Sequence, residues 1–166
     1  SGTQSDKRSV DMTDWNARFM SLAAHVATWS KDRSTKVGSV IIGSEREIVS
    51  VGYNGFARRI SDDHPERHER PLKYLMTVHA EANAVLNAHR VGARVSGCDL
   101  YVTAFPPCAS CSNVIVQAGI KRVFCYPTPE RNDTLERWRE DIIWGEVIRR
   151  EGGVETIYME RNPCQA

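Results

Sequence analysis

The chain has 166 residues, 41% of them hydrophobic, which is enough to bury a core within one domain. Its formal net charge is only +1, so the chain lacks the overall positive charge that attracts a long nucleic acid. No run of residues is long and apolar enough to span a membrane, and the start of the chain lacks the pattern of a secretion signal. We therefore expect a cytoplasmic protein that acts on a small molecule.

The polar residues 1–10 are expected to be a disordered lead-in, with Ser1 and Gly2 as a candidate tag remnant. No repeat or low-complexity linker divides residues 11–160, so we expect one domain there. Five cysteines is an odd count. Two of them belong to a motif described below, and Cys98, Cys125 and Cys164 are expected to be reduced, mostly packed thiols.

The first elements are a helix and a hairpin. Apolar residues recur at helical spacing over residues 13–30, with Thr13 or Asp14 as the candidate N-cap. His25 lies near this apolar face and is expected to be a core or interface residue rather than a ligand. A polar loop over 31–36 then leads to two antiparallel strands at 37–43 and 47–52, with a turn between them.

The second strand ends in a turn in which Gly52 and Gly55 bracket Tyr53 and Asn54. Glycines permit a sharp turn and a close approach of the backbone to another group. Asn54 is either a turn residue with no other role or a hydrogen-bonding contact for a substrate.

Residues 56–75 are charged and predicted to form an irregular insertion, with a solvated loop as the simplest interpretation. His64 and His68 have a spacing that a second zinc ion could use, although no further cysteine or histidine lies nearby. Arginine side chains in this insertion are candidates for contacting a phosphate; they are Arg58, Arg59, Arg67 and Arg70.

The second half of the chain alternates helices and strands. Helices are predicted over 78–88, 108–118 and 134–150, and strands over 99–104, 121–126 and 154–159. This alternation after an opening hairpin predicts an α/β protein with a mixed sheet and helices on both faces.

Two half-motifs fall at predicted helix starts, His79-x-Glu81 and Pro107-Cys108-x-x-Cys111. One imidazole and two thiolates fill three corners of a tetrahedral zinc site, and water takes the fourth in a catalytic centre. Glu81 cannot easily be a ligand from the same turn as His79, so it is free to transfer protons. A closed structural zinc site or a redox cysteine pair is the alternative.

Together these half-motifs form the H-x-E…P-C-x-x-C signature of zinc-dependent nucleobase deaminases. With the hairpin start at 34–38, the turn at 52–55 and the long insertion before His79, the chain resembles the cytidine and deoxycytidylate deaminase superfamily over nearly its whole length. The deoxycytidylate branch is the most similar. The resemblance implies a three-layer α/β/α fold around a five-stranded mixed sheet.

The resemblance also implies roles for individual residues. Zinc would bind to His79, Cys108 and Cys111, while Glu81 would shuttle protons. The backbone N–H of Ala80 would contact the pyrimidine carbonyl, and Asn54 the sugar. A tyrosine commonly contacts the phosphate, and Tyr126 is the tyrosine near the expected place.

The predicted reaction is hydrolytic deamination of a cytosine nucleotide, with deoxycytidine monophosphate (dCMP) as the first choice. Water activated by zinc attacks C4, and Glu81 delivers protons to N3 and to the leaving amine. Alternatives are the same chemistry on transfer-RNA adenosine, a free base or a modified nucleotide, and a non-catalytic nucleotide-binding zinc domain. The resemblance further implies a homo-oligomer, commonly a hexamer, and control by a deoxynucleoside triphosphate effector.

Overall fold

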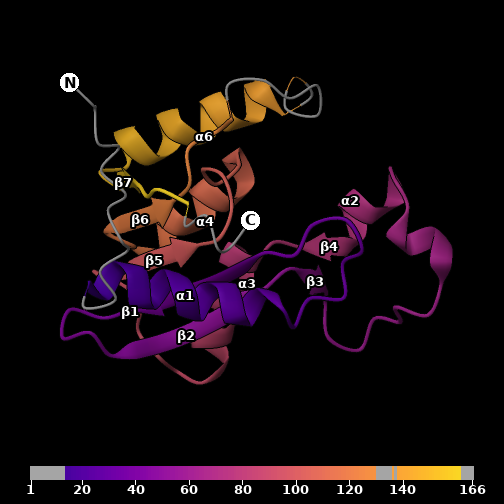
Figure 1. Ribbon diagram of the computed structural model, residues 1–166, viewed down its shortest axis with the longest axis horizontal. Coiled ribbons are helices and arrows are strands. Elements are labelled where there is room, and N and C mark those ends of the chain that lie inside the picture. Colours follow the sequence, from indigo (N-terminus) through magenta and orange to yellow (C-terminus); the bar gives the residue numbers. More distant parts are fainter. Residues whose placement is uncertain (1–13, 130–135, 137, 162–166) are drawn as a thin grey trace, which may run out of the picture.

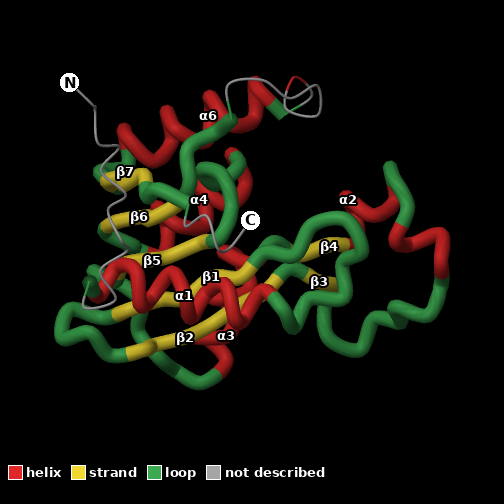
Figure 2. The backbone as a smooth tube through the Cα atoms, in the orientation of Figure 1, coloured by secondary structure: helices red, strands yellow, loops and turns green. Residues whose placement is uncertain are grey.

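The computed structural model describes residues 14–129, 136 and 138–161, arranged around a five-stranded sheet (Figures 1 and 2). The strand order across the sheet is β2-β1-β5-β6-β7. The strands are β1 (Gly38–Ile42), β2 (Ile48–Tyr53), β5 (Asp99–Val102), β6 (Arg122–Cys125) and β7 (Glu155–Tyr158).

The sheet is mixed, as the alternation of elements predicts. Strand β1 is antiparallel to β2 and to β5, whereas β6 runs parallel to β5 and to β7. The hairpin supplies the antiparallel edge because a short turn joins β1 to β2. Each parallel pair needs a crossover connection, which the helices provide.

Helices cover both faces of the sheet, which confirms the three-layer α/β/α architecture (Figure 1). Helix α1 (Trp15–Ala27) packs on one face, against the side chains of Val40, Tyr101 and Phe124. The opposite face carries α3 (Ala80–Arg90), α4 (Ala109–Ala118) and α6 (Arg139–Glu151). Neighbouring strand residues face the α3 and α4 side because side chains alternate along a strand, and these residues are Ile41, Leu100 and Val123.

Helix α3 lies unusually close to the hairpin at Gly52. A Cβ atom at Gly52 would lie only 2.3 Å from the Ala84 nitrogen and 2.5 Å from the Ala80 oxygen. The Ser39 hydroxyl on β1 donates to the same Ala80 oxygen at 2.7 Å. The close approach expected at this glycine is therefore real, and it fixes the start of α3 relative to the sheet.

The insertion contains more regular structure than the sequence suggests (Figure 2). It holds β3 (Gly55–Phe56), the 3-10 helix η1 (Pro65–His68), α2 (Leu72–Met76) and β4 (Thr77–Val78), and β3 pairs with β4 in a separate two-stranded sheet. Lys31 pairs with Asp62 at 2.8 Å and Lys73 pairs with Asp32 at 2.9 Å. These contacts join segments that are distant in sequence, which is why local patterns do not predict them.

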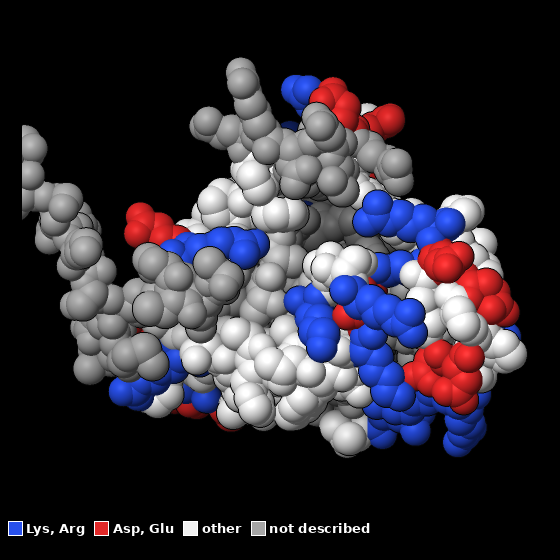
Figure 3. All heavy atoms as spheres, turned by 45° about the vertical axis from the view of Figure 1, so that its right-hand side comes forward, with Lys and Arg blue, Asp and Glu red and all other residues white. Residues whose placement is uncertain are grey.

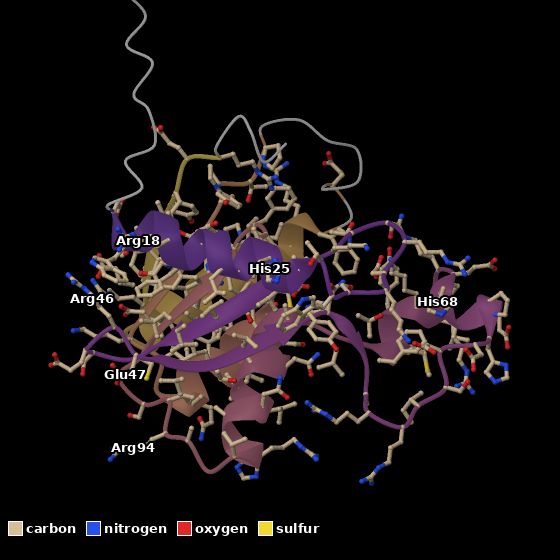
Figure 4. All side chains as sticks on the ribbon, turned by 60° about the horizontal axis from the view of Figure 1, so that its bottom comes forward. Arg18, His25, Arg46, Glu47, His68 and Arg94 are labelled. Carbon is tan, nitrogen blue, oxygen red and sulfur yellow. The ribbon has the colours of Figure 1, made fainter. Side chains whose placement is uncertain are left out.

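The remaining predicted helices and strands are found with bounds that are shortened or displaced by a few residues; the helix predicted over 78–88, for example, is Ala80–Arg90. Asp14 is the N-cap of α1, its carboxylate accepting from the Asn16 N–H at 2.9 Å. His25 is exposed on the outer side of α1 rather than in the core, with its ring edge against Trp29 (Figure 4). Cys98 and Cys125 are buried free thiols as expected. The predicted lead-in over 1–10, Cys164 and the first residues of the predicted helix at 134–150 lie outside the described residues.

None of the helices described within residues 14–129 and 138–161 has the length and apolar character that crossing a membrane requires.

Candidate metal centre

The two half-motifs meet where α3 and α4 begin. His79 is the N-cap residue of α3, and Cys108 is the N-cap residue of α4, with Cys111 one turn further on. The Nδ1 atom of His79 lies 3.5 Å from the Cys108 sulfur and 3.4 Å from the Cys111 sulfur. All three candidate ligand atoms lie within 4.8 Å of one another.

These separations fit a zinc ion. Zinc binds sulfur at about 2.3 Å and imidazole nitrogen at about 2.0–2.1 Å, so tetrahedral geometry places the nitrogen and a sulfur about 3.5 Å apart. The chemistry of the donor set, one imidazole and two thiols, also suits zinc. Within residues 14–129, 136 and 138–161, this is the one cluster of three metal-ligating side chains. If zinc binds to these three side chains, the fourth tetrahedral position would be left to a water molecule.

The position at two helix starts favours negative charge. The first N–H groups of a helix lack intrahelical partners, and the helix dipole is positive at that end. The Cys108 sulfur accepts from the Cys111 backbone N–H at 3.5 Å, as an N-cap side chain does. Helix α4 therefore stabilises the thiolate that a metal ion needs.

The two thiols influence each other's acidity. Cys108 accepts hydrogen bonds from the Cys111 thiol and the His79 ring, and these lower the pKa of Cys108 well below its ordinary value. The Cys111 thiol is the donor in that pair, so its own pKa is raised, and burial raises it further. Of the two thiols Cys108 is therefore the more acidic, and a zinc ion would bring both cysteines to the thiolate form.

Glu81 lies in the first turn of α3, beside the candidate ligands. Its side chain is buried, with 6% of the residue exposed, and one carboxylate oxygen lies 4.0 Å from the Cys111 sulfur. Burial raises the pKa of Glu81, an effect that the nearby His79 partly opposes. A carboxyl group with a raised pKa can accept and return a proton near neutral pH.

A cavity of about 560 Å³ opens beside the centre, and its lining includes His79, Ala80, Glu81 and Cys108. Figure 3 brings the insertion forward and shows Lys and Arg side chains gathered over it, around a hollow in the surface. Further lining residues come from the loop before β1, the turn after β2, the insertion and the start of α6, and include Ser34, Asn54, Arg70, Lys73, Tyr74, Trp138 and Asp141.

Asn54 lines this cavity, but its side chain also has a structural task. The Asn54 Oδ1 atom accepts from the Val37 N–H at 2.8 Å, and its Nδ2 atom donates to the Thr35 carbonyl at 2.9 Å. The amide therefore holds the loop before β1 against the turn after β2. The second hydrogen on Nδ2 is the group that a ligand in the cavity could use.

The other two predicted substrate contacts lie in different surroundings. Ala80 is the first residue of α3, so its N–H is not used by the helix ladder, and it lines the cavity. Tyr126 does not line the cavity. It follows the end of β6, and the alternation of the strand directs its ring into the core cluster beneath α1, where Arg161 lies over it at 4.7 Å.

The sequence reasoning missed several lining residues. Lys73 and Tyr74 belong to α2, which was expected to be irregular, and Trp138 and Asp141 belong to the start of the last helix. The Tyr74 hydroxyl is buried, with no hydrogen-bond partner among the described residues. Of the four arginines singled out in the insertion, Arg70 lines the cavity. The basic composition of the insertion was the sequence feature that could have indicated these lining residues.

The histidines of the insertion gather no second metal cluster in the described part of the chain. His68 contacts the Asp62 carbonyl oxygen at 2.6 Å, and its ring stacks on Phe56 (Figure 4). His64 lies 3.6 Å from the Glu66 carboxylate. Both rings thus have protein partners that a second zinc site would have to displace.

Comparison with known proteins finds deaminases. Residues 13–127 match the family model for the cytidine and deoxycytidylate deaminase zinc-binding region. A protein of Aliivibrio fischeri described as an uncharacterized deaminase is 44% identical over 149 residues, which cover 89% of this chain and 95% of that protein. Human deoxycytidylate deaminase is 40% identical over 122 residues, which cover 70% of this chain and 67% of that enzyme.

Solved structures share the fold. The dCMP deaminase of the cyanophage S-TIM5, crystallised with dCMP and dUMP, superposes with a TM-score of 0.67 over 86% of this chain and 95% of that one. Its sequence is 24% identical to this chain, so the likeness concerns the architecture.

Proposed function

The chain belongs to the zinc-binding family of cytidine and deoxycytidylate deaminases, and we propose that it hydrolyses deoxycytidine monophosphate to deoxyuridine monophosphate and ammonia. The observation that carries this proposal is a buried carboxylate, Glu81, beside three ligand atoms that fit zinc. The 40% identity to deoxycytidylate deaminases supports the choice of substrate.

His79, Cys108 and Cys111 would hold the zinc ion in this proposal. Bound zinc supplies a water molecule whose pKa is lowered to about 7. Glu81 would take a proton from that water as the water oxygen bonds to C4, and deliver it to N3 of the cytosine ring. It would then take the remaining proton from the new hydroxyl at C4 and give it to the amine, which leaves as ammonia when the C4–N bond breaks. Burial raises the pKa of Glu81, which makes its carboxylate a stronger base for taking up the proton.

The backbone N–H of Ala80 would donate to the pyrimidine carbonyl, and Asn54 would donate to the sugar with its remaining Nδ2 hydrogen. Both residues line the same cavity as His79 and Glu81, which supports these contacts. Tyr126, predicted as a phosphate contact, lies outside this lining, so we propose that Arg70 and Lys73 contact the phosphate instead. The Tyr74 hydroxyl, which has no hydrogen-bond partner among the described residues, adds a neutral donor beside them.

The phosphate assignment is tested with Arg70→Gln. A charge-assisted hydrogen bond contributes about 1.5–3 kcal/mol, so the variant should raise KM for dCMP by about 10- to 100-fold. Turnover of deoxycytidine, which has no phosphate, should change little. Arg67→Gln is the matched control, because Arg67 donates to the Ser61 carbonyl within the insertion and does not line the cavity. Equal effects on dCMP and deoxycytidine would contradict the assignment.

The substrate itself is tested by measuring ammonia release from a panel of cytidine, deoxycytidine and their phosphates, with zinc content determined on the same sample. The highest kcat/KM is expected for dCMP. Transfer-RNA adenosine, free guanine and cytosine, and 5-substituted nucleotides complete the panel. Faster turnover of one of these would replace the substrate, and binding without turnover of any would identify a nucleotide-binding zinc domain.

We further propose that residues 11–160 act as one cytoplasmic domain that assembles into a homo-oligomer, with a hexamer as the expected state. Exposed apolar side chains support assembly, since Trp29, Tyr53 and Leu86 are 50%, 40% and 50% exposed in the single chain. Light scattering measures the mass, with six times 18.7 kDa expected. Assaying turnover with each deoxynucleoside triphosphate tests the proposed effector control.

A further inference from the structure

One face of α6 is directed at the segment that leads into the candidate ligand Cys108. Asp141, Gly145 and Arg149 are spaced four residues apart, which places them on the same side of the helix. Each of them contacts, or lies very close to, residues 107–112. Helix α6 lies along α4 in Figure 1, outside the matched residues 13–127.

Asp141 contacts the residue directly after Cys108. Its Oδ1 atom accepts the backbone N–H of Ala109 at 2.9 Å. Ala109 is the first residue of α4, so this N–H has no partner within the helix. A carboxylate from α6 therefore caps α4 at the turn that carries both cysteines.

Arg149 contacts the residue directly before Cys108. Its Nη1 atom donates to the Pro107 carbonyl at 2.8 Å and to the Ser112 hydroxyl at 2.7 Å, while its Nε atom donates to Thr156 at 3.1 Å. The residue is 0% exposed, and burial lowers the pKa of its guanidinium. A buried cation of this kind is costly, so it indicates a requirement beyond filling space.

Gly145 allows the helix to come this close. A Cβ atom at this position would lie 2.4 Å from the Pro107 oxygen and 3.1 Å from the Ser112 hydroxyl. A side chain here would push α6 away and break the contacts of Arg149. Gly145, Asp141 and Arg149 thus all lie against the backbone of residues 107–109.

We propose that α6 sets the position of the zinc ligand Cys108, with Asp141 and Arg149 as positioning residues that hold the backbone on either side of it. Neither residue is needed as a ligand or as a proton carrier. Their effect reaches the metal through the Pro107 carbonyl and the Ala109 N–H. This inference rests on the proposed zinc ligands, but not on the identity of the nucleotide.

The first test compares Arg149→Met with Arg150→Met, an exposed neighbour on the same helix. The zinc dissociation constant is measured by competition with a chelator, and Cys108 ligation by the thiolate-to-metal absorption of the cobalt-loaded protein. Residues that support metal ligands typically change metal affinity by about 10- to 100-fold. We expect weakening of that size and an altered cobalt spectrum for Arg149→Met, and neither for the control. A lower Tm with unchanged zinc affinity and spectrum would overturn the proposal.

The second test remains informative if Arg149→Met does not fold. Asp141→Asn keeps an oxygen that can accept from Ala109, whereas Asp141→Ala removes it, and Glu140→Ala is the exposed control. We expect zinc affinity and kcat to fall about tenfold in Asp141→Ala, to stay within about threefold in Asp141→Asn, and KM to change little in either. Equal losses in the Asn and Ala variants would contradict positioning by this hydrogen bond.

These measurements separate this inference from the proposed function. Zinc affinity and the cobalt spectrum are read without substrate, so they stand even if the panel identifies another nucleotide. A wrong substrate assignment would instead show normal zinc binding in the unchanged protein and no preference for dCMP.

Discussion

The Nδ1 atom of His79 lies 3.4 Å from the Sγ atom of Cys111, a residue 32 positions further along the chain. Both residues belong to helix starts, α3 for the histidine and α4 for the cysteine, and the two helices pack on the same face of the sheet. The sheet therefore holds two positive helix ends side by side, where the thiolates that bind a metal ion are stabilised.

Replacing Glu81 should separate chemistry from metal binding. General acid–base catalysis contributes about 10²–10⁴-fold, so Glu81→Gln should lower kcat on dCMP by at least that factor. Zinc content should stay at that of the unchanged protein, because Glu81 is not one of the three clustered ligands. Glu45→Gln, in an exposed turn, is the control. Near-normal turnover in Glu81→Gln would remove the carboxylate from the reaction.

Removing the metal should expose one reactive thiol. Hydrogen bonds from the Cys111 thiol and the His79 ring lower the pKa of Cys108, which favours its thiolate form, whereas burial raises the pKa of Cys125 to about 12. Stripping zinc with a chelator should therefore speed iodoacetamide labelling of Cys108, with Cys125 staying slow. Peptide mass spectrometry locates the label, and adding zinc back should protect Cys108. Labelling of Cys108 at the same rate with and without zinc would argue against its being a ligand.

Asn54→Ala should affect stability as well as activity. The change removes two part-buried hydrogen bonds, those with the Val37 N–H and the Thr35 carbonyl, and each contributes about 0.5–1.5 kcal/mol. For a chain of this size, this loss corresponds to a fall in Tm of roughly 2–4 °C per kcal/mol. Thermal unfolding and dCMP assays well below Tm measure the two effects. Lost stability with unchanged KM and kcat would leave Asn54 a purely structural turn residue.

The ion pair between Asp32 and Lys73 predicts a specific pH dependence. Burial raises the Asp32 pKa, but hydrogen bonds from the Thr35 N–H and Lys73 outweigh it, so the pKa falls below the ordinary value of 3.8. A lowered folded pKa means that the ionised carboxylate stabilises the fold above pH 3.8, and that this stabilisation is lost as pH falls through the folded value.

Asp32→Asn should therefore lower Tm by a similar amount anywhere between about pH 6 and 8, with the difference shrinking only in acid below about pH 4. Thermal melts of both proteins across this range provide the measurement. Asp63→Asn is the control, since Asp63 does not take part in the Lys73 contact. A gap that already closes between pH 6 and 8 would mean that Asp32 does not titrate as stated.

The sequence alone predicted the main sheet, the helices packed on its faces and the three side chains that meet as candidate metal ligands. Helical and strand periodicity are local signals, and the spacing within His79-x-Glu81 and Cys108-x-x-Cys111 already directs each pair to one helix turn. The lining residues Lys73 and Tyr74, and the contacts of Asp141 and Arg149 with α4, were decided by tertiary structure. They depend on how the insertion folds back and on how α6 lies against α4. Packing between segments that are distant in the chain produces no periodic pattern in the sequence, so the sequence does not predict it.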